Sequence, residues 1–202
     1  KHEPMPLVKF TPSMEVTEVW SKGLSSAEGF LVPAVYDDMV FAAGGKTLTR
    51  LNARTGETEW SVSFNSPITG GVGSDGYVTA VGLWDGNLEV VDAEGKVSWE
   101  KKLTTELASP PVVSHGLVIA RTMDTRVSAF EASSGELQWT YQRSQPALTV
   151  RLPTRMLAHD NFLLVGQPNG HIVILDIASG KPMFEFQVAQ AKGVTEVERL
   201  VD

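Results

Sequence analysis

The residues best suited to chemistry lie in two short stretches of this chain. Arg151 ends the first stretch, and a guanidinium can hold a carboxylate or backbone carbonyls with two parallel hydrogen bonds. Leu148 and Val150 alternate on one face of an extended segment and would be apolar anchors beside it. Asp202, in the second stretch, could pair with Arg151. These side chains suit recognition of a protein partner, although their spacing equally fits the start of a core strand followed by a solvated charge.

Patterns for catalysis, metal binding or nucleic-acid binding are lacking. The four histidines share no metal-ligand spacing, and they are His2, His115, His159 and His171. Asp37-Asp38 fits a turn better than a catalytic pair, and Gly44–Thr47 lacks the earlier glycine and the following helix of a phosphate loop. The net charge of −7 argues against a nucleic-acid partner. We therefore expect no catalytic residue, no metal and no cofactor.

Large aromatic residues recur about every 40 residues, a period typical of propeller blades. They are Trp20, Trp60, Trp99, Trp139 and Phe184. A glycine stands four residues before each of the last four, and these are Gly56, Gly95, Gly135 and Gly180. The glycine permits positive φ in a tight turn, and the aromatic then falls inside the next strand. We predict that all five aromatics are structural and that each staples one sheet to its neighbour.

Each repeat contains four short apolar runs separated by turn residues, and no stretch has sustained helical periodicity. Four-stranded units of this length are β-propeller blades. We expect an all-β fold with about four complete blades, plus a lone N-terminal outer strand. The expected segments are an extended arm at 1–14, the outer strand of an otherwise missing blade at 15–22, blades at 32–66, 67–106, 107–144 and 154–189, and connectors at 145–153 and 190–202.

Composition leaves the cellular compartment open. Hydrophobic residues make up 42% of the chain and charged residues 20%, as in an ordinary globular protein. No apolar stretch approaches the ~20 residues of a membrane span. The lack of cysteine fits a periplasmic, secreted or cytosolic protein. The lone strand at 15–22 indicates roughly half of a larger ring with bare apolar flanks, so we expect two copies to pair through these ends.

The blades resemble those of the quinoprotein-type, or PQQ-like, propellers, and within that group the chain is most similar to the BamB family. Two segments carry this closer match. Pro146–Arg151 (PALTVR) is similar to the family pattern L-x-L-R, and Gly193–Asp202 (GVTEVERLVD) is similar to T-E-x-x-R-L-x-D-x-D. Val150 replaces the second Leu of the first pattern. The resemblance covers the whole chain and maps onto the N-terminal half of an eight-bladed ring.

The resemblance implies a non-enzymatic scaffold of the outer-membrane β-barrel assembly machinery, at the periplasmic face of the Gram-negative outer membrane. Family members are tethered by a lipidated N-terminal cysteine, which would lie upstream of Lys1. They bind a POTRA domain of the BamA insertase and assist delivery and insertion of unfolded outer-membrane proteins. Carried over position by position, the partner-binding residues are Leu148, Val150, Arg151 and Asp202.

Two other function classes share this blade. A fragment of a PQQ-dependent quinoprotein dehydrogenase would commonly carry a vicinal cysteine pair and calcium-binding carboxylates, and this chain has no cysteine. A generic propeller adaptor of WD40 type is the other alternative. Trp84-Asp85 is a literal W-D pair, but it falls at a hairpin turn and is not repeated. We therefore predict that Trp84 is an exposed turn residue.

Overall fold

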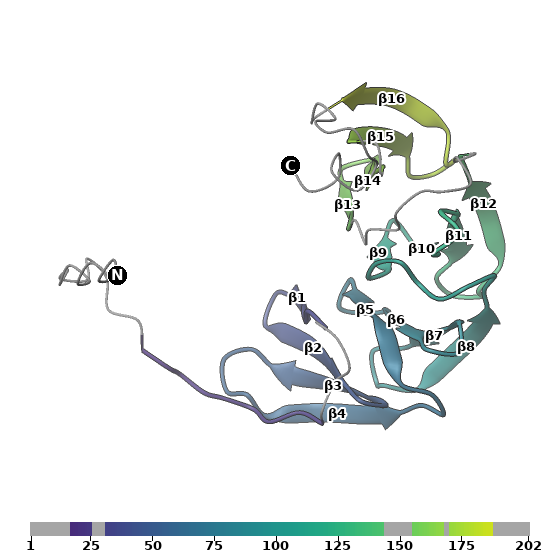
Figure 1. Ribbon diagram of the computed structural model, residues 1–202. Coiled ribbons are helices and arrows are strands. Elements are labelled where there is room, and N and C mark those ends of the chain that lie inside the picture. The colour runs from purple at the N-terminus through teal and green to yellow at the C-terminus, as the bar shows by residue number, and fades with distance from the viewer. Residues whose placement is uncertain (1–16, 26–30, 144–154, 168–169, 188–202) are drawn as a thin grey trace, which may run out of the picture.

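The computed structural model describes residues 17–25, 31–143, 155–167 and 170–187, and its regular structure there is four antiparallel sheets of four strands each (Figure 1). The strands are β1 (Ala34–Tyr36), β2 (Met39–Gly44), β3 (Thr47–Asn52), β4 (Thr58–Ser63), β5 (Ile68–Ser74), β6 (Thr79–Leu83), β7 (Asn87–Val91), β8 (Val97–Lys102), β9 (Val112–Ser114), β10 (Leu117–Arg121), β11 (Val127–Glu131), β12 (Leu137–Tyr141), β13 (Met156–His159), β14 (Phe162–Gly166), β15 (His171–Asp176) and β16 (Pro182–Gln187). The predicted all-β fold with four four-stranded blades is confirmed. Among the same residues, no helix is long and apolar enough to cross a membrane.

Each blade is built in chain order, from an inner strand to an outer one. The sheet orders are β1-β2-β3-β4, β5-β6-β7-β8, β9-β10-β11-β12 and β13-β14-β15-β16. The four blades follow one another along an open arc, with β1, β5, β9 and β13 on its inner side and β4, β8, β12 and β16 on its outer side (Figure 1). Consecutive strands are joined by tight turns, and Asp37, His115 and Asp160 have positive φ at the first turn of their blades.

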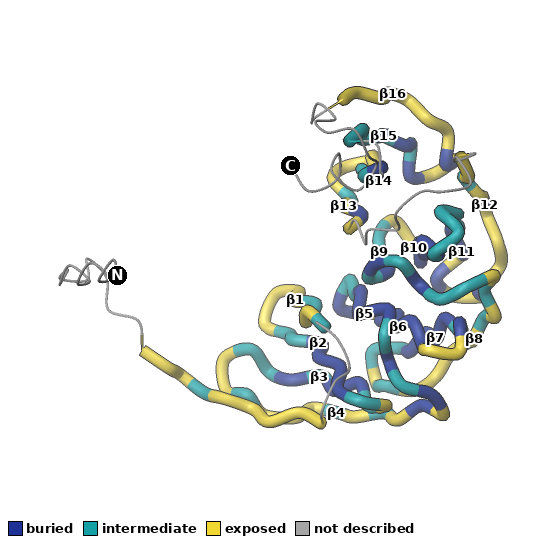
Figure 2. The backbone as a smooth tube through the Cα atoms, viewed as in Figure 1, coloured by how far each residue is buried: buried dark blue, intermediate teal, exposed yellow. Residues whose placement is uncertain are grey.

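The hydrophobic core lies between the blades rather than inside them. Three clusters of buried side chains fill the three gaps between consecutive blades, and buried residues concentrate on the middle strands (Figure 2). The largest fully buried side chains include Phe41, Leu48, Ile68, Leu83, Leu88, Ile119, Leu163, Leu175 and Ile177. Strand β6 belongs to blade 2 and has a neighbouring blade on each face, which is why it is buried along its whole length.

The segment that carries Trp20 does not form a strand. Residues 17–25, which include most of the outer strand expected at 15–22, run beside blade 1 without joining a sheet (Figure 1). The physical reason is that a strand needs a hydrogen-bonded neighbour, and among the described residues no strand pairs with this segment. Tertiary contacts of Trp20, and not a ladder, hold this segment in place.

Candidate functional site

Each tryptophan of the repeat donates its indole N–H to a backbone carbonyl of the following blade. The Nε1···O distances are 2.8 Å for Trp20 to Ala53, 2.9 Å for Trp60 to Ala93, 2.8 Å for Trp99 to Ala132 and 2.8 Å for Trp139 to Ile177. The acceptor always lies in the turn between the third and fourth strands of the next blade. The same bond therefore joins the 17–25 segment to blade 1 and each later blade to its successor.

The glycine of that turn forms the seat for the incoming ring. Gly56, Gly95, Gly135 and Gly180 all have positive φ, between 68° and 81°. A Cβ added at any of them would come within 2.4 to 2.8 Å of the tryptophan ring of the preceding blade. Sequence reasoning explained these glycines by the turn alone. The structure adds that the ring itself leaves no room for a side chain.

Phe184 has the same register but a different environment. It pairs with Ile174 across the outer strands, as Trp139 pairs with Ala129. Its side chain is 62% exposed, because no blade follows β16 within the part of the chain that the structure describes. Met183 and Phe186 on the same strand are also exposed. The apolar outer strand of blade 4 is therefore an uncovered surface in this arrangement (Figure 2).

The four residues expected to bind a partner lie outside the described residues. They are Leu148, Val150, Arg151 and Asp202. The described chain stops at Arg143, just after the outermost strand of blade 3, and resumes at Arg155, just before the innermost strand of blade 4. The structure therefore places Arg143 and Arg155, the described residues on either side of 144–154, on two adjacent blades.

Polar contacts join blades 3 and 4 at the last described residue before that connector. Arg143 Nη1 hydrogen-bonds Glu185 Oε1 on β16, and His171 Nδ1 lies 2.9 Å from the same oxygen. The hydrogen bond from Arg143 holds the pKa of the Glu185 carboxyl below its usual range and raises the pKa of the guanidinium. Blade 3 is thus tied to blade 4 immediately before residues 144–154.

Glu89 is a buried acid that the sequence analysis did not identify. Glu89 on β7 is only 7% exposed, and it lies directly opposite Glu100 on β8. Burial, and then repulsion from Glu100, raises the pKa of Glu89 to about 7. The available signal was the run Asn87–Val91, in which one acid interrupts an apolar strand. The described residues contain no group of three or more side chains arranged to hold a metal ion.

Trp84 behaves as predicted. It lies in the turn between β6 and β7, its ring is 60% exposed, and its backbone N–H donates to Pro67 O at 2.8 Å. The W-D pair therefore takes no part in the repeated staple.

Comparison with known proteins identifies the family. The family described as "Outer membrane protein assembly factor BamB" matches residues 44–202. The protein of that name from Burkholderia pseudomallei is 38% identical over 202 residues, covering 98% of this chain and 53% of the relative. The chain thus spans about half the length of the curated relatives that it matches.

Solved structures agree on the fold. The crystal structure of BamB from Moraxella catarrhalis has a TM-score of 0.72 at 28% identity, over 84% of this chain and 52% of that one. A quinohemoprotein alcohol dehydrogenase from Pseudomonas putida HK5 has a TM-score of 0.63 at 19% identity, over 81% of this chain and 35% of that one. The second likeness shows the fold alone. On its four-bladed fold, its family match and its curated relatives, this chain belongs to the BamB family of outer membrane protein assembly factors.

Proposed function

We propose that this chain is a non-enzymatic scaffold that binds a periplasmic POTRA domain of the BamA insertase and assists delivery and insertion of unfolded outer-membrane proteins. The observation that carries the proposal is the family match over residues 44–202, which includes both connectors. The proposed location is the periplasmic face of the Gram-negative outer membrane, reached through a lipid anchor upstream of Lys1.

The proposed contact surface consists of Leu148, Val150, Arg151 and Asp202. Arg151 would bind a carboxylate or backbone carbonyls of the partner, and the two apolar side chains would exclude water around that contact. The Arg143–Glu185 pair supports this role, because it fixes the blade on which the first connector begins. A connector that starts from a fixed point loses less conformational entropy on binding than one that starts from a loose end.

The enzymatic alternative has a weaker basis. The dehydrogenase likeness is at 19% identity, and the chain contains none of the cysteine expected beside a quinone cofactor. The named relatives are assembly factors. A protein-binding role is therefore the function that the family match supports best.

The test is Arg151→Ala, measured by calorimetric titration with an isolated POTRA domain. We expect binding at least about tenfold weaker, because a charge-assisted contact at an interface is worth ~1.5–3 kcal/mol. The melting temperature should not change, since we expect Arg151 to lie outside the core. Arg54→Ala is the matched control, because Arg54 is an exposed arginine that pairs with Asp38 in a turn of blade 1. Equal affinity of the Arg151 variant and the parent would remove this residue from the interface.

A further inference from the structure

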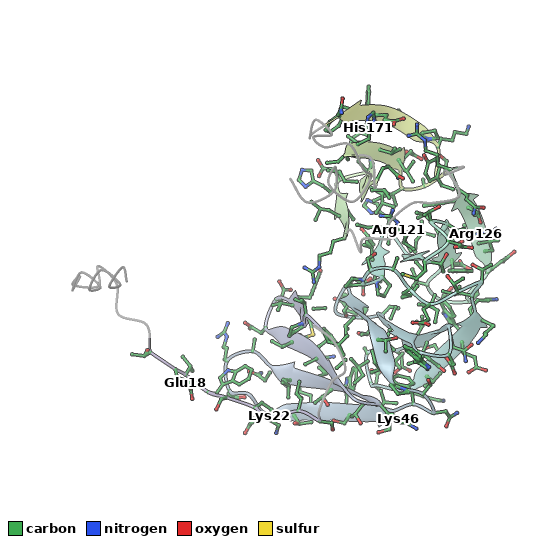
Figure 3. All side chains as sticks on the ribbon, viewed as in Figure 1. Glu18, Lys22, Lys46, Arg121, Arg126 and His171 are labelled. Carbon is green, nitrogen blue, oxygen red and sulfur yellow. The ribbon has the colours of Figure 1, made fainter. Side chains whose placement is uncertain are left out.

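A cationic groove lies between blades 2 and 3. Its volume is about 340 Å³, and it is bounded by β8 on one side and by β10, β11 and β12 on the other. Leu103, Phe130 and Leu137 contribute apolar walls. Lys101 and Arg126 contribute two positive charges, in a chain whose net charge is −7. Arg126 lies beside β12 towards the outer side of the arc (Figure 3).

The equivalent groove between blades 3 and 4 supplies an internal comparison. It has a volume of about 290 Å³ and is lined by Arg143 and Glu185. There the carboxylate of Glu185 accepts hydrogen bonds from Arg143 and pairs with His171. Glu185 directly follows the repeat aromatic of its blade. The guanidinium of Arg143 is therefore neutralised by a carboxylate of the protein itself.

The groove between blades 2 and 3 lacks that carboxylate. The position equivalent to Glu185 is Thr140, which directly follows Trp139, and Arg126 occupies the position of His171. Arg126 Nη2 donates to Gln142 Oε1 at 3.2 Å, while its Nε is buried without a hydrogen-bond partner. Because Nε is buried, an acceptor in the groove would bind the Nη atoms of this guanidinium, of which Nη2 already donates to Gln142.

One carboxylate of the chain, that of Asp124, offsets part of this positive charge. Asp124 is near Arg126, but its Oδ1 already accepts from the hydroxyl of Thr122 and from the backbone N–H of Arg126 at 3.4 Å. Lys102 Nζ donates to the carbonyl of Asp85. One carboxylate, that of Asp124, therefore faces two cations, Lys101 and Arg126, and the remaining positive charge favours an anionic ligand.

We propose that this groove binds an extended polypeptide segment in which an acidic side chain stands two residues from an apolar one. Residues two apart in an extended chain point to the same side, so both side chains enter the groove together. The acidic group takes the position that Glu185 holds in the next groove, and the apolar one contacts Leu103, Phe130 and Leu137. The volume lies at the lower end of the ~300–1,000 Å³ of ligand pockets, which fits two side chains better than a long acyl chain.

The experiment titrates the full chain, with labelled leucine methyl groups, with the blocked peptide acetyl-Ser-Leu-Ser-Glu-Ser-amide. We expect saturable NMR shifts at Leu103 and Leu137, and at least about tenfold weaker binding of the same peptide with Gln in place of Glu. Arg126→Gln should weaken binding of the Glu peptide to the level of the Gln peptide. A third arm uses 4-phenylbutyrate, a free carboxylate with an apolar body.

Thr140→Glu is the decisive variant, because it supplies the missing carboxylate from within and should abolish binding. Thr140→Gln is its neutral control and should bind like the parent, and near-UV circular dichroism checks that both are folded. The proposal is overturned if the two peptides bind equally, if Thr140→Glu binds like the parent, or if no shift saturates. Saturation by 4-phenylbutyrate without saturation by the Glu peptide would also overturn it, since the ligand would then not be a polypeptide.

Discussion

Trp139 shows, at the residue scale, what the repeated aromatic contributes. Its ring is 8% exposed and belongs to the buried cluster between blades 3 and 4, together with Met156 and Val173. Its N–H reaches the carbonyl of Ile177. One side chain thus supplies a large buried apolar area and satisfies a backbone acceptor in the adjacent sheet, a combination that only tryptophan offers at this size.

Trp139→Ala should lower the free energy of unfolding by about 3–5 kcal/mol, because it leaves a cavity between two blades. Trp84→Ala is the matched control, since that ring is exposed, and it should change stability by no more than about 0.5 kcal/mol. Urea denaturation of the two variants and the parent measures both effects. Similar losses of stability for the two substitutions would show that burial of the ring between blades does not determine the loss.

Glu89 is the residue at which stability should depend most clearly on pH. Its pKa of about 7 in the folded protein exceeds the value of 4.5 for an unperturbed side chain. Folding therefore favours the protonated form. The resulting stabilisation is fully present below about pH 4.5 and is lost as the pH rises through about 7.

Glu89→Gln should remove this dependence, because the amide is neutral at every pH and can still donate to Glu100. We expect the variant to match the parent near pH 5 and to exceed it at pH 8.5, by at most about 3 kcal/mol. Glu94→Gln, in an exposed turn of the same blade, controls for the loss of one negative charge. The measurement is urea denaturation at both pH values. If the difference in the free energy of unfolding between variant and parent were the same at both, the raised pKa of Glu89 would be contradicted.

At the scale of the element, the turn between the third and fourth strands of each blade has two structural roles. It reverses the chain through a glycine with positive φ, and it receives the ring of the preceding blade. Gly135 combines both, with φ of 72° and a position where a Cβ would lie 2.8 Å from the Trp99 ring. Gly116, in the turn between β9 and β10, has φ of 71° but open space around it.

Alanine substitutions at Gly116 and Gly135 separate the cost of backbone strain from the cost of a collision with the tryptophan ring. Gly116→Ala should lower stability by only the ~1–2 kcal/mol of a left-handed alanine. Gly135→Ala should lower it by about 1–3 kcal/mol more, because the Trp99 ring must move from its seat. Thermal and urea denaturation of both variants would measure the difference. Equal losses would mean that the ring adjusts freely and that only the turn requires glycine.

At the scale of the whole molecule, the blades form an arc whose two flanks differ. On blade 4 the outer strand β16 exposes Met183, Phe184 and Phe186, whereas the 17–25 segment lies against blade 1 (Figure 2). Exposed apolar surface on a terminal sheet favours association. Self-association of this chain through its flanks therefore remains our prediction.

Light scattering over a range of concentrations tests this association. We expect the mass of the 202-residue chain to rise with concentration towards that of a dimer. Phe184→Ser should reduce the rise, because it removes the most exposed large side chain of β16. Thr140→Ser, on β12 and away from that strand, is a suitable control. A constant monomer mass at high concentration would contradict the prediction.

The parts of the fold that could be predicted are those encoded by neighbours in sequence. The aromatic spacing, the turn glycines and the four apolar runs of each repeat are local patterns, and they correctly predict four four-stranded blades. Whether the segment around Trp20 forms a strand could not be predicted in the same way, since strand formation depends on a partner that is distant in the sequence. The connector residues, including Arg151, were identified through family resemblance and stay a prediction.

The sequence by itself determined the repeat, the order of strands within a blade and the family, because each depends on residue types at fixed spacing. Only the tertiary structure decided which side chains meet across blades. The turn glycine beneath the tryptophan ring, the burial of Glu89 opposite Glu100, and the cations of the groove between blades 2 and 3 all join residues from different strands or blades. Such contacts are set by how the sheets stack, and sheet stacking depends on side chains about 40 residues apart.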